Sequence, residues 1–358
     1  MDYYNLLNPD PAMSVDLDLQ NEKSRVAVSK SNAKYREAIK RLKELEAQLS
    51  IINAINSDHC EAIAIKAKGP FKKTHHSQAV AVINCSDWHV GELVDPKTVN
   101  GKNSFNVDIC RKRVNYLSQN GLRLVDMFAQ DVTIDTIMLA CLGDFVTNYL
   151  HPDNNETNTL APAPEVVEAY RLLKKLIVFL LDNSKYKIVI PCCFGNHARM
   201  TDKKRNANMV GTSSEYIIYH LLADYFENEP RVQFDIAEGM HLYASVFGMK
   251  LRLHHGDGIN FYGGVGGLEI PLRKSLAQWD KVERVDFDFL GHWHQTKVDW
   301  NKYAVNGSLI GWNAFALKIK ADYEPPRQTL LLLDRDRGLT VVCPIILSEV
   351  QRQIYSLS

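Results

Sequence analysis

The pattern of hydrophobic and polar positions changes at about residue 58. From about residue 22 to 55 the chain is rich in Lys, Arg, Glu and Ala and contains neither Gly nor Pro. Apolar residues recur in this stretch with the seven-residue spacing of an amphipathic helix. The residues with this spacing are Val28, Tyr35, Leu42 and Leu49, with Ala38, Leu45 and Ile52 between them. We therefore predict an N-terminal segment, residues 1–58, that contains one long helix.

The amphipathic helix has more than one use open to it. Its apolar stripe suits a coiled coil with a second copy of the chain, giving a homodimer, and it also suits a partner protein or the globular body of the same chain. The pattern extends over only three to four heptads, which is near the lower limit for predicting a coiled coil. The pattern alone does not decide between these uses.

From residue 59 onward, short apolar β-branched runs alternate with helical stretches. This alternation is typical of α/β proteins, and two hairpin-like pairs, at 242–255 and 329–343, indicate mixed sheets. We predict that residues 59–358 form one layered α/β domain with mixed β-sheets flanked by helices. The expected strands are 79–84, 136–142, 187–193, 242–247, 250–255, 285–290 and 329–334, and the expected helices are 107–130, 164–181 and 213–226.

Composition excludes several classes of protein. The 358 residues carry 42 basic and 42 acidic side chains, and 46% of them are hydrophobic, so a disordered chain is excluded. The zero formal charge also argues against binding of nucleic acid by bulk positive charge, although local basic patches remain compatible with it. The seven cysteines form no C-x-x-C pair and indicate reduced thiols. With no apolar run long enough to cross a membrane, we expect a cytoplasmic protein that does not bind membranes.

Side chains that can bind metals follow five of the expected strands. Gly precedes three of these groups, which lets the backbone turn sharply. Because α/β proteins build sites where strands end, we expect the five groups to meet at one edge of the sheet. The groups are Asp87 and His89, Asp144, Asn196 and His197, His254 and His255, and His292 and His294.

This ordered set resembles the signature of the calcineurin-like metallophosphoesterase superfamily, which reads D-x-H, G-D, G-N-H, a later His and G-H-x-H. The resemblance covers most of residues 79 to 310 and implies a metallophosphoesterase-type fold. The chain also resembles members of that superfamily encoded by bacteriophages, for which the host cytoplasm is the expected location.

The resemblance implies two metal sites that share one carboxylate. One site would contain Asp87, His89, Asp144 and His294; the other would contain Asp144, Asn196, His255 and His292. His255 is preferred to His254 because the superfamily's ligand usually stands directly before Gly. Mixed oxygen and nitrogen ligands suit Mn²⁺, Fe²⁺, Zn²⁺ or Ni²⁺ better than Mg²⁺ or Ca²⁺, and we expect two divalent ions, preferably Mn²⁺.

Such a pair of ions activates water for attack on a phosphate ester. His197, next to Asn196, would then serve as the general acid at the leaving oxygen. The sequence departs from the superfamily here, because Ala198 stands where an acidic residue usually orients this imidazole. Asp257 or Glu92 are candidate replacements for it.

Candidate substrate contacts lie close to these motifs. Arg199 is expected to contact phosphate, and Asn148 either contacts substrate or forms a structural turn. Both precede a basic cluster suited to a phosphodiester backbone, which consists of Lys203, Lys204 and Arg205.

The start of the first motif, D-x-H-x-G at 87–91, is similar to the nuclease branch that contains Mre11 and SbcD. We therefore expect a metal-dependent phosphodiesterase with exonuclease or endonuclease activity. The alternatives are a phosphodiesterase or phosphatase of small, including cyclic, nucleotides and a non-catalytic scaffold that binds partners through its helix.

Overall fold

The computed structural model describes residues 11–57, 77–150, 157–261, 267–318 and 320–348. It divides into two compact units, Met1–Lys72 and Lys73–Ser358. The predicted domain boundary between residues 58 and 59 lies outside the described residues and stays a prediction. No described helix combines the length and apolar composition that crossing a membrane requires.

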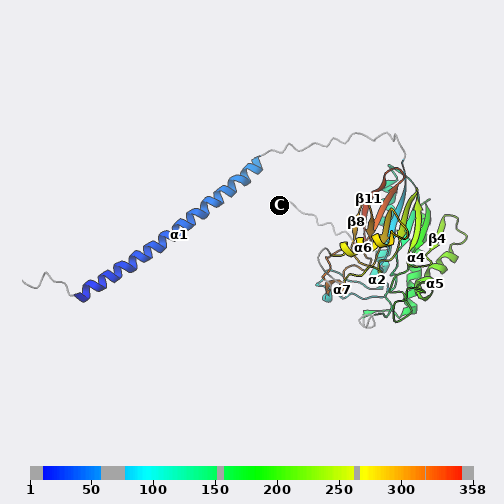
Figure 1. Cartoon of the computed structure of the whole chain (residues 1–358), viewed down its shortest axis with the longest axis horizontal. Coiled ribbons are helices and arrows are strands. Elements are labelled where there is room, and N and C mark those ends of the chain that lie inside the picture. Colours follow the sequence, from blue (N-terminus) through cyan, green and yellow to red (C-terminus); the bar gives the residue numbers. More distant parts are fainter. Residues whose placement is uncertain (1–10, 58–76, 151–156, 262–266, 319, 349–358) are drawn as a thin grey trace, which may run out of the picture. The chain divides into compact units, whose positions relative to one another are not determined.

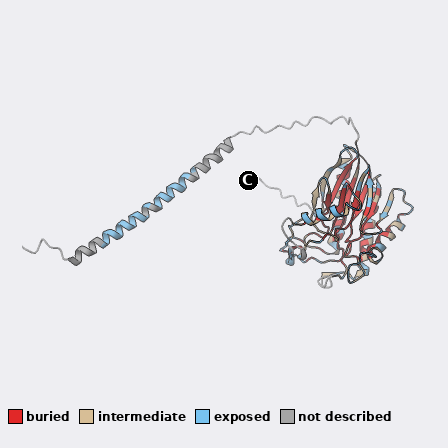
Figure 2. Ribbon diagram, in the orientation of Figure 1, coloured by how far each residue is buried: buried red, intermediate tan, exposed pale blue. Residues whose placement is uncertain are grey.

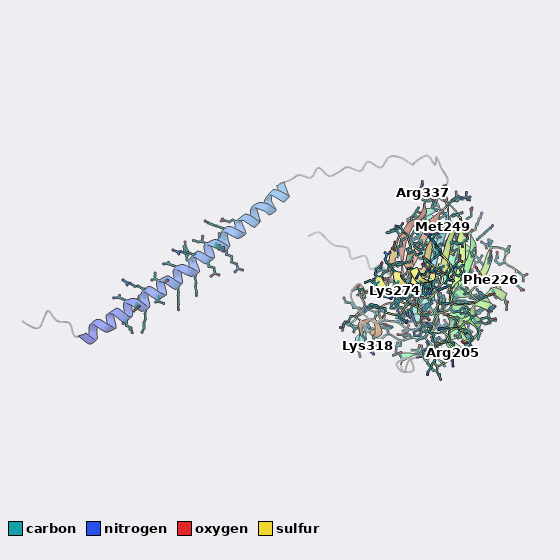
Figure 3. All side chains as sticks on the ribbon, in the orientation of Figure 1. Arg205, Phe226, Met249, Lys274, Lys318 and Arg337 are labelled. Atoms are coloured by element: carbon teal, nitrogen blue, oxygen red, sulfur yellow. The ribbon has the colours of Figure 1, made fainter. Side chains whose placement is uncertain are left out.

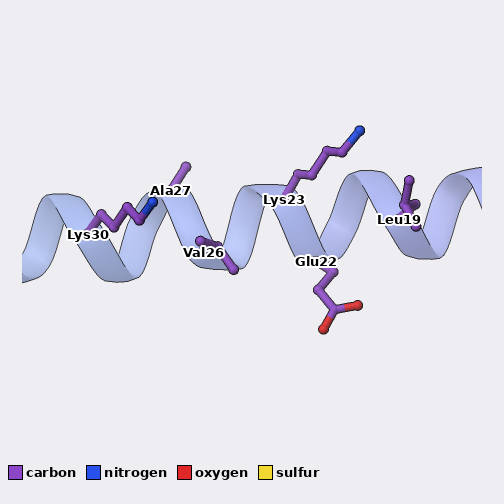
Figure 4. A pocket seen from close by; sticks show the side chains of 6 residues that line it. All are labelled: Leu19, Glu22, Lys23, Val26, Ala27 and Lys30. Carbon is purple, nitrogen blue, oxygen red and sulfur yellow. The ribbon is translucent and has the colours of Figure 1, made fainter.

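The first unit contains one long helix, α1 (Pro11–Ser57), which begins earlier than the predicted residue 22. Three residues of the predicted stripe, Val28, Tyr35 and Leu42, are exposed along it. Figure 4 shows how apolar and charged side chains alternate around its first described turns, where Leu19 and Val26 stand among Glu22, Lys23 and Lys30. The helix includes positions 45, 49 and 52, whose side chains are not among those that the structure describes.

We expect the exposed stripe of α1 to join two copies of the chain as a coiled coil, because large apolar side chains at seven-residue spacing gain by burial. Replacing Val28 and Leu42 with Glu should convert a dimer into a monomer, measured by light scattering. The control, Ser29→Glu with Lys40→Gln, makes the same change in net charge away from the stripe and should leave the dimer intact. A monomeric wild-type chain would contradict the expectation.

The second unit contains a six-stranded sheet with the strand order β11-β10-β1-β2-β3-β4 (Figure 1). Strands β1 to β4 run parallel, whereas β10 and β11 form an antiparallel hairpin along β1. The strands are β1 (Gln78–Cys85), β2 (Thr133–Cys141), β3 (Lys187–Cys192), β4 (Val232–Ile236), β10 (Arg327–Asp334) and β11 (Gly338–Ile346).

A second sheet has the order β5-β6-β7-β9-β8 and mixes parallel with antiparallel pairs. Its strands are β5 (Leu242–Val246), β6 (Met249–Leu253), β7 (Phe287–Leu290), β8 (Lys297–Asp299) and β9 (Tyr303–Val305).

Helices connect the strands of both sheets. Among them, α4 contacts both α2 and α5, and α2 also contacts β11. The α-helices are α2 (Val107–Phe128), α4 (Pro162–Asn183), α5 (Ser214–Tyr225), α6 (Glu269–Trp279) and α7 (Ala314–Lys318), with short 3₁₀ helices η1 (Pro96–Val99) and η2 (Val210–Thr212).

One apolar core joins the two sheets. It contains residues of β1 and β2, such as Val82 and Leu139, together with Leu251 of β6 and Phe289 of β7. Continuous apolar runs form these strands because both of their faces are covered. Figure 2 shows the buried residues concentrated in the sheets, with exposed residues on the outside of the unit.

The predicted fold class is confirmed, since two mixed sheets are flanked by helices. All seven expected strands and all three expected helices of this unit occur, with ends shifted by at most three residues. Helix α2 begins where its sequence indicates, because the Asn106 side chain caps it by accepting a bond of 2.9 Å from the Ile109 amide. Strands β4, β8 and β9 and helix α6 were not predicted, because such short elements carry a weak periodic signal.

One expectation about the sheet is wrong. The chemistry-bearing strand ends do not share a single sheet edge, since β1, β2 and β3 belong to the first sheet and β6 and β7 to the second. The hydrophobic pattern of a strand reports burial but not which sheet the strand joins.

A buried ion pair joins the two strands that lead to the last motifs. Arg252 of β6 and Asp288 of β7 are opposite one another and fully buried, with Arg252 Nε 2.6 Å from Asp288 Oδ1. A second bond, from Arg252 Nη2 to Asp288 Oδ2, measures 3.1 Å and makes the pair bidentate. The pair therefore joins β6 and β7, the strands that precede His255 and His292 in the sequence.

Replacing Asp288 with Asn should lower the free energy of unfolding by about 3 kcal/mol, because the Arg252 charge would lose its main buried partner. Urea unfolding measures the change. The control is Glu283→Gln, which breaks the exposed pair with Lys250 and should leave the unfolding curve unchanged. A wild-type curve for Asp288→Asn would contradict this role of the pair.

Candidate metal centre

The candidate ligands stand on short turns directly after their strands. Five of them have left-handed backbone conformations, with φ between 48° and 70°: Asp87, His89, Asp144, His292 and His294. Such a conformation costs a non-glycine residue about 1–3 kcal/mol and is concentrated at functional sites. The fold must therefore supply the stabilisation that holds these turns.

Hydrogen bonds between the first two turns supply part of that stabilisation. The amide of Asp87 donates to the carbonyl of Gly143 over 3.0 Å, and the amide of Trp88 donates to the carbonyl of Asp144 over 2.8 Å. Parallel pairing of β1, β2 and β3 aligns Cys85 with Cys141 and Cys141 with Cys192, so the turns leave the sheet at the same level. The register of the sheet thus brings the turns together.

Two glycines permit a close approach to the carboxylates. A Cβ atom on Gly195 would lie 2.1 Å from Oδ1 of Asp144, and one on Gly291 would lie 2.7 Å from Oδ2 of Asp87. Both distances are shorter than a van der Waals contact. Gly precedes these motifs because a side chain would displace the carboxylates.

The first group of potential ligands consists of Asp87, His89 and His294, each offering one atom within 4.8 Å of the others. The Nε2 atoms of His89 and His294 are 3.2 Å apart, and Nε2 of His294 is 3.3 Å from Oδ1 of Asp87. Two ligands of one first-row cation, with bonds of about 2.1 Å, lie about 3–3.4 Å apart. The group therefore fits a single transition-metal ion.

The second group consists of Asp144, His255 and His292. Nε2 of His255 lies 2.9 Å from Oδ2 of Asp144, 3.2 Å from Nδ1 of His292 and 3.2 Å from Oδ1 of Asn196. A third group joins Asp144 to His89 and His197. Asp144 thus lies between the two candidate sites, as a bridging carboxylate would.

The tautomer of His255 suits a ligand. Its Nδ1 lies 2.7 Å from the carbonyl of Leu142, which can only accept a hydrogen bond, so Nδ1 carries the proton. In the neutral ring, the lone pair of Nε2 then points toward Asp144 and is available to a metal. His254, the neighbour, is buried against Trp279, which agrees with the choice of His255.

Buried charges perturb the titration of the centre. Burial favours the neutral form of Asp144, but the imidazoles of His255 and His197 hold its pKa well below the usual range. Burial likewise disfavours a charged His255, but Asp144 raises the pKa of that ring to about 10. Burial and the charge of His255 lower the pKa of His292 to about 4. The carboxylate therefore depends on positive charge close to it, which a cation can supply.

His197, the candidate acid, lies beside both groups. Its amide donates to Oδ1 of Asp144 over 2.8 Å, and its ring meets that of His89 edge to face with centroids 4.7 Å apart. Its Nδ1 is 2.9 Å from the main-chain carbonyl of Thr147. A main-chain carbonyl therefore takes part in orienting this imidazole.

Of the two acidic residues suggested as replacements, Glu92 lies close enough to His197 for the charge of that ring to offset part of the rise that burial causes in the pKa of Glu92. Asp257 forms an ion pair with Lys204. Glu92 accepts a hydrogen bond of 3.1 Å from Asn313 and lies 4.0 Å from Nδ1 of His89.

The predicted substrate contacts surround the turn at 196–199. Asn148 donates from its side chain to the carbonyls of His197 and Arg199, over 3.2 and 2.8 Å, which is a structural turn role. Arg199 donates to the carbonyl of Asn196 over 2.9 Å. Lys203 and Arg205 are exposed, and Figure 3 marks Arg205 on the second unit. Contact of these residues with substrate stays a prediction.

Two buried glutamates escaped the sequence analysis. Glu165 and Glu215 stand in the first turns of α4 and α5 and have no solvent exposure. Glu215 accepts from the amides of Phe145 and Gly195 over 2.9 and 2.8 Å, next to Asp144 and Asn196. Glutamate is common in the first turn of a helix because the helix dipole favours it, so no sequence signal singles these two out.

No family model and no curated protein matches the chain. Among solved structures, a predicted phosphoesterase from Streptococcus pneumoniae is 12% identical, with a TM-score of 0.27, over 74% of this chain and 97% of its own. A hypothetical protein from Pyrococcus horikoshii is 12% identical, with a TM-score of 0.34, over 75% of this chain and 89% of its own.

The zinc complex of the Vps29 protein from Entamoeba histolytica is 15% identical, with a TM-score of 0.24, and the match covers 44% of this chain and 82% of that protein. Similarities this low transfer neither an activity nor a substrate to the chain. The chemistry of the centre must follow from its own residues.

Replacing Asp144 with Asn should remove metal from both sites, because this carboxylate lies between them. Replacing His197 with Ala should preserve the metal content and slow turnover by about 10²–10⁴-fold, the range of a general acid. Elemental analysis of the purified proteins measures the metal content, with Asp131→Asn as an exposed-acid control. The rate of phosphodiester hydrolysis measures the turnover. Loss of metal from His197→Ala would show that His197 is a ligand and not the acid.

Proposed function

We propose that the chain is a phosphodiesterase of the calcineurin-like superfamily that depends on two divalent metal ions. The observation that carries the proposal is the buried carboxylate of Asp144, which belongs to one group of potential ligands with His255 and His292 and to another with His89 and His197, next to the group of Asp87, His89 and His294. The facing ring nitrogens of His89 and His294, and of His255 and His292, are 3.2 Å apart, a separation at which each pair can share a proton or bind one cation.

Seven side chains would hold the metals. Two bound divalent ions would supply positive charge that activates water and stabilises the phosphate oxygens. Mn²⁺ is the preferred ion because the ligands mix oxygen and nitrogen, with Fe²⁺, Zn²⁺ and Ni²⁺ as alternatives. The first site would use Asp87, His89, Asp144 and His294, and the second Asp144, Asn196, His255 and His292.

His197 would donate a proton to the leaving oxygen. With Nδ1–H directed at the Thr147 carbonyl, the opposite nitrogen, Nε2, is the one that can exchange a proton with the ester. The bond from the His197 amide to Asp144 keeps the ring next to the shared carboxylate. Proton donation at this position would assist departure of a poor leaving group.

The proposed substrate is a phosphodiester of nucleic acid. Arg199, Lys203 and Arg205 follow Asn196 on one loop, so a backbone held there would place one phosphate near the centre. Lys204 would shape this loop through its ion pair with Asp257. The D-x-H-x-G start of the first motif favours a nuclease, whereas the zero net charge favours small nucleotides, which require no extended basic surface.

Hydrolysis assays separate the proposals. With Mn²⁺, the protein should hydrolyse bis-p-nitrophenyl phosphate and a labelled single-stranded oligonucleotide, and p-nitrophenyl phosphate should react at least about tenfold more slowly. KM for the oligonucleotide should rise with salt concentration, because phosphate contacts release counterions. Asp144→Asn serves as the inactive control.

The other outcomes identify the alternatives. Cleavage of cyclic dinucleotides without cleavage of the oligonucleotide would establish a small-nucleotide enzyme. Inactivity with every divalent metal tested would overturn the enzymatic proposal and favour a scaffold.

A further inference from the structure

We propose that Glu165 is a positioning residue for His197 and acts through the peptide unit between Thr147 and Asn148. This inference rests on the proposed function, because the proposed function assigns His197 the role of general acid. It describes one way in which the ring of His197, which Ala198 follows in the sequence, is oriented.

Glu165 reaches the centre from the first turn of α4. Its side chain is fully buried, and its carboxylate accepts hydrogen bonds from the amides of Gly91, Thr147 and Asn148, over 3.0, 2.5 and 2.9 Å. The side-chain amide of Asn158 lies 3.3 Å from the same carboxylate. A buried carboxylate with this many donors is fully solvated by the protein and has little freedom to move.

One of these bonds continues to His197. The amide of Asn148 and the carbonyl of Thr147 belong to the same peptide unit. The amide donates to Oε2 of Glu165, and the carbonyl accepts from Nδ1 of His197 over 2.9 Å. A negative charge bonded to the N–H end of a peptide makes its carbonyl a stronger acceptor, because hydrogen bonds in series polarise one another. The carboxylate therefore fixes the ring and its Nδ1–H tautomer through one peptide.

Other contacts hold this peptide in place. Asn148 has a left-handed backbone with φ of 57°, and its side chain donates to the carbonyls of His197 and Arg199. Among the described residues, the buried hydroxyl of Thr147 has no hydrogen-bond partner, and the contact with His197 is made by the main-chain carbonyl of Thr147. The residue after His197 is the buried Ala198, which offers no competing carboxylate.

Glu215 provides a matched comparison. It is also a fully buried glutamate in the first turn of a helix, and it also accepts two main-chain amides beside the centre. The amide of Phe145 and the carbonyl of Asp144 belong to the same peptide unit. Glu215 accepts from that amide, and the carbonyl accepts from the amides of Trp88 and His89. The peptide that Glu215 bonds thus meets the turn of Asp87 and His89, whereas the peptide that Glu165 bonds through Asn148 meets the ring of His197.

The test compares Glu165→Gln with Glu215→Gln on two diesters, one with a nitrophenyl and one with an alkyl leaving group. The nitrophenolate leaves without protonation, whereas the alkoxide from the alkyl ester requires a proton from a general acid as it leaves. Glu165→Gln should lower kcat about tenfold or more for the alkyl ester, less than about threefold for the nitrophenyl ester, and leave KM and metal content unchanged. Glu215→Gln should affect both esters equally.

A double variant sharpens the result. In the His197→Ala background, Glu165→Gln should cause no further loss of kcat, because the group that it positions is absent. Equal slowing of both esters, or a further loss in that background, would show that Glu165 only stabilises the fold and would overturn the inference. If Glu165→Gln does not fold, Glu165→Asp, which keeps the charge but is shorter, should show the same difference between the two esters.

A measurement without turnover separates this inference from the proposed function. In metal-free protein with ¹⁵N-labelled histidine, the ring of His197 should show a protonated Nδ1, and Glu165→Gln should shift this signal while Glu215→Gln should not. An unprotonated Nδ1, or a signal unchanged by Glu165→Gln, would overturn the inference. A wild-type protein inactive on every ester would overturn the proposed function and leave this spectroscopic result standing.

Discussion

The centre depends on keeping one carboxylate, that of Asp144, ionised inside the protein. A buried carboxylate is expensive unless hydrogen bonds and opposite charge replace the water that it loses. Asp144 obtains them from His197, whose amide meets Oδ1, and from His255, whose ring meets Oδ2. Since these residues come from two sheets and from turns far apart in sequence, the carboxylate requires the complete tertiary structure before it can be buried.

The same requirement explains the architecture around the centre. Several candidate ligands have a left-handed backbone conformation. Backbone strain of this kind persists only where several independent contacts hold the residue in place. Here the determinants are main-chain bonds between the turns, glycines without a Cβ, and the carboxylates of Glu165 and Glu215. Helices α4 and α5 thus take part in the site through one side chain each.

The sequence analysis was most successful where a local pattern carries the information. Period-two and continuous apolar runs located the long strands, and metal-binding residue types after those strands indicated the candidate ligands, from Asp87 to His294. Two expectations depended on more than local pattern. Assignment of β6 and β7 to the same sheet as β1 failed because strand pattern does not encode sheet membership. The search for an acidic partner of His197 considered only side chains, whereas a main-chain carbonyl also contacts its Nδ1 in the structure.

The sequence by itself determined the fold class, the helices and strands that carry the motifs, and the residue types able to bind metal, because each of these follows from spacing along the chain. Only the tertiary structure decided that Asp144 lies between two ligand groups, that Thr147 orients His197 and that Glu165 lies behind them. Those contacts join residues 18 to 207 positions apart, and no periodicity records which distant side chains will meet.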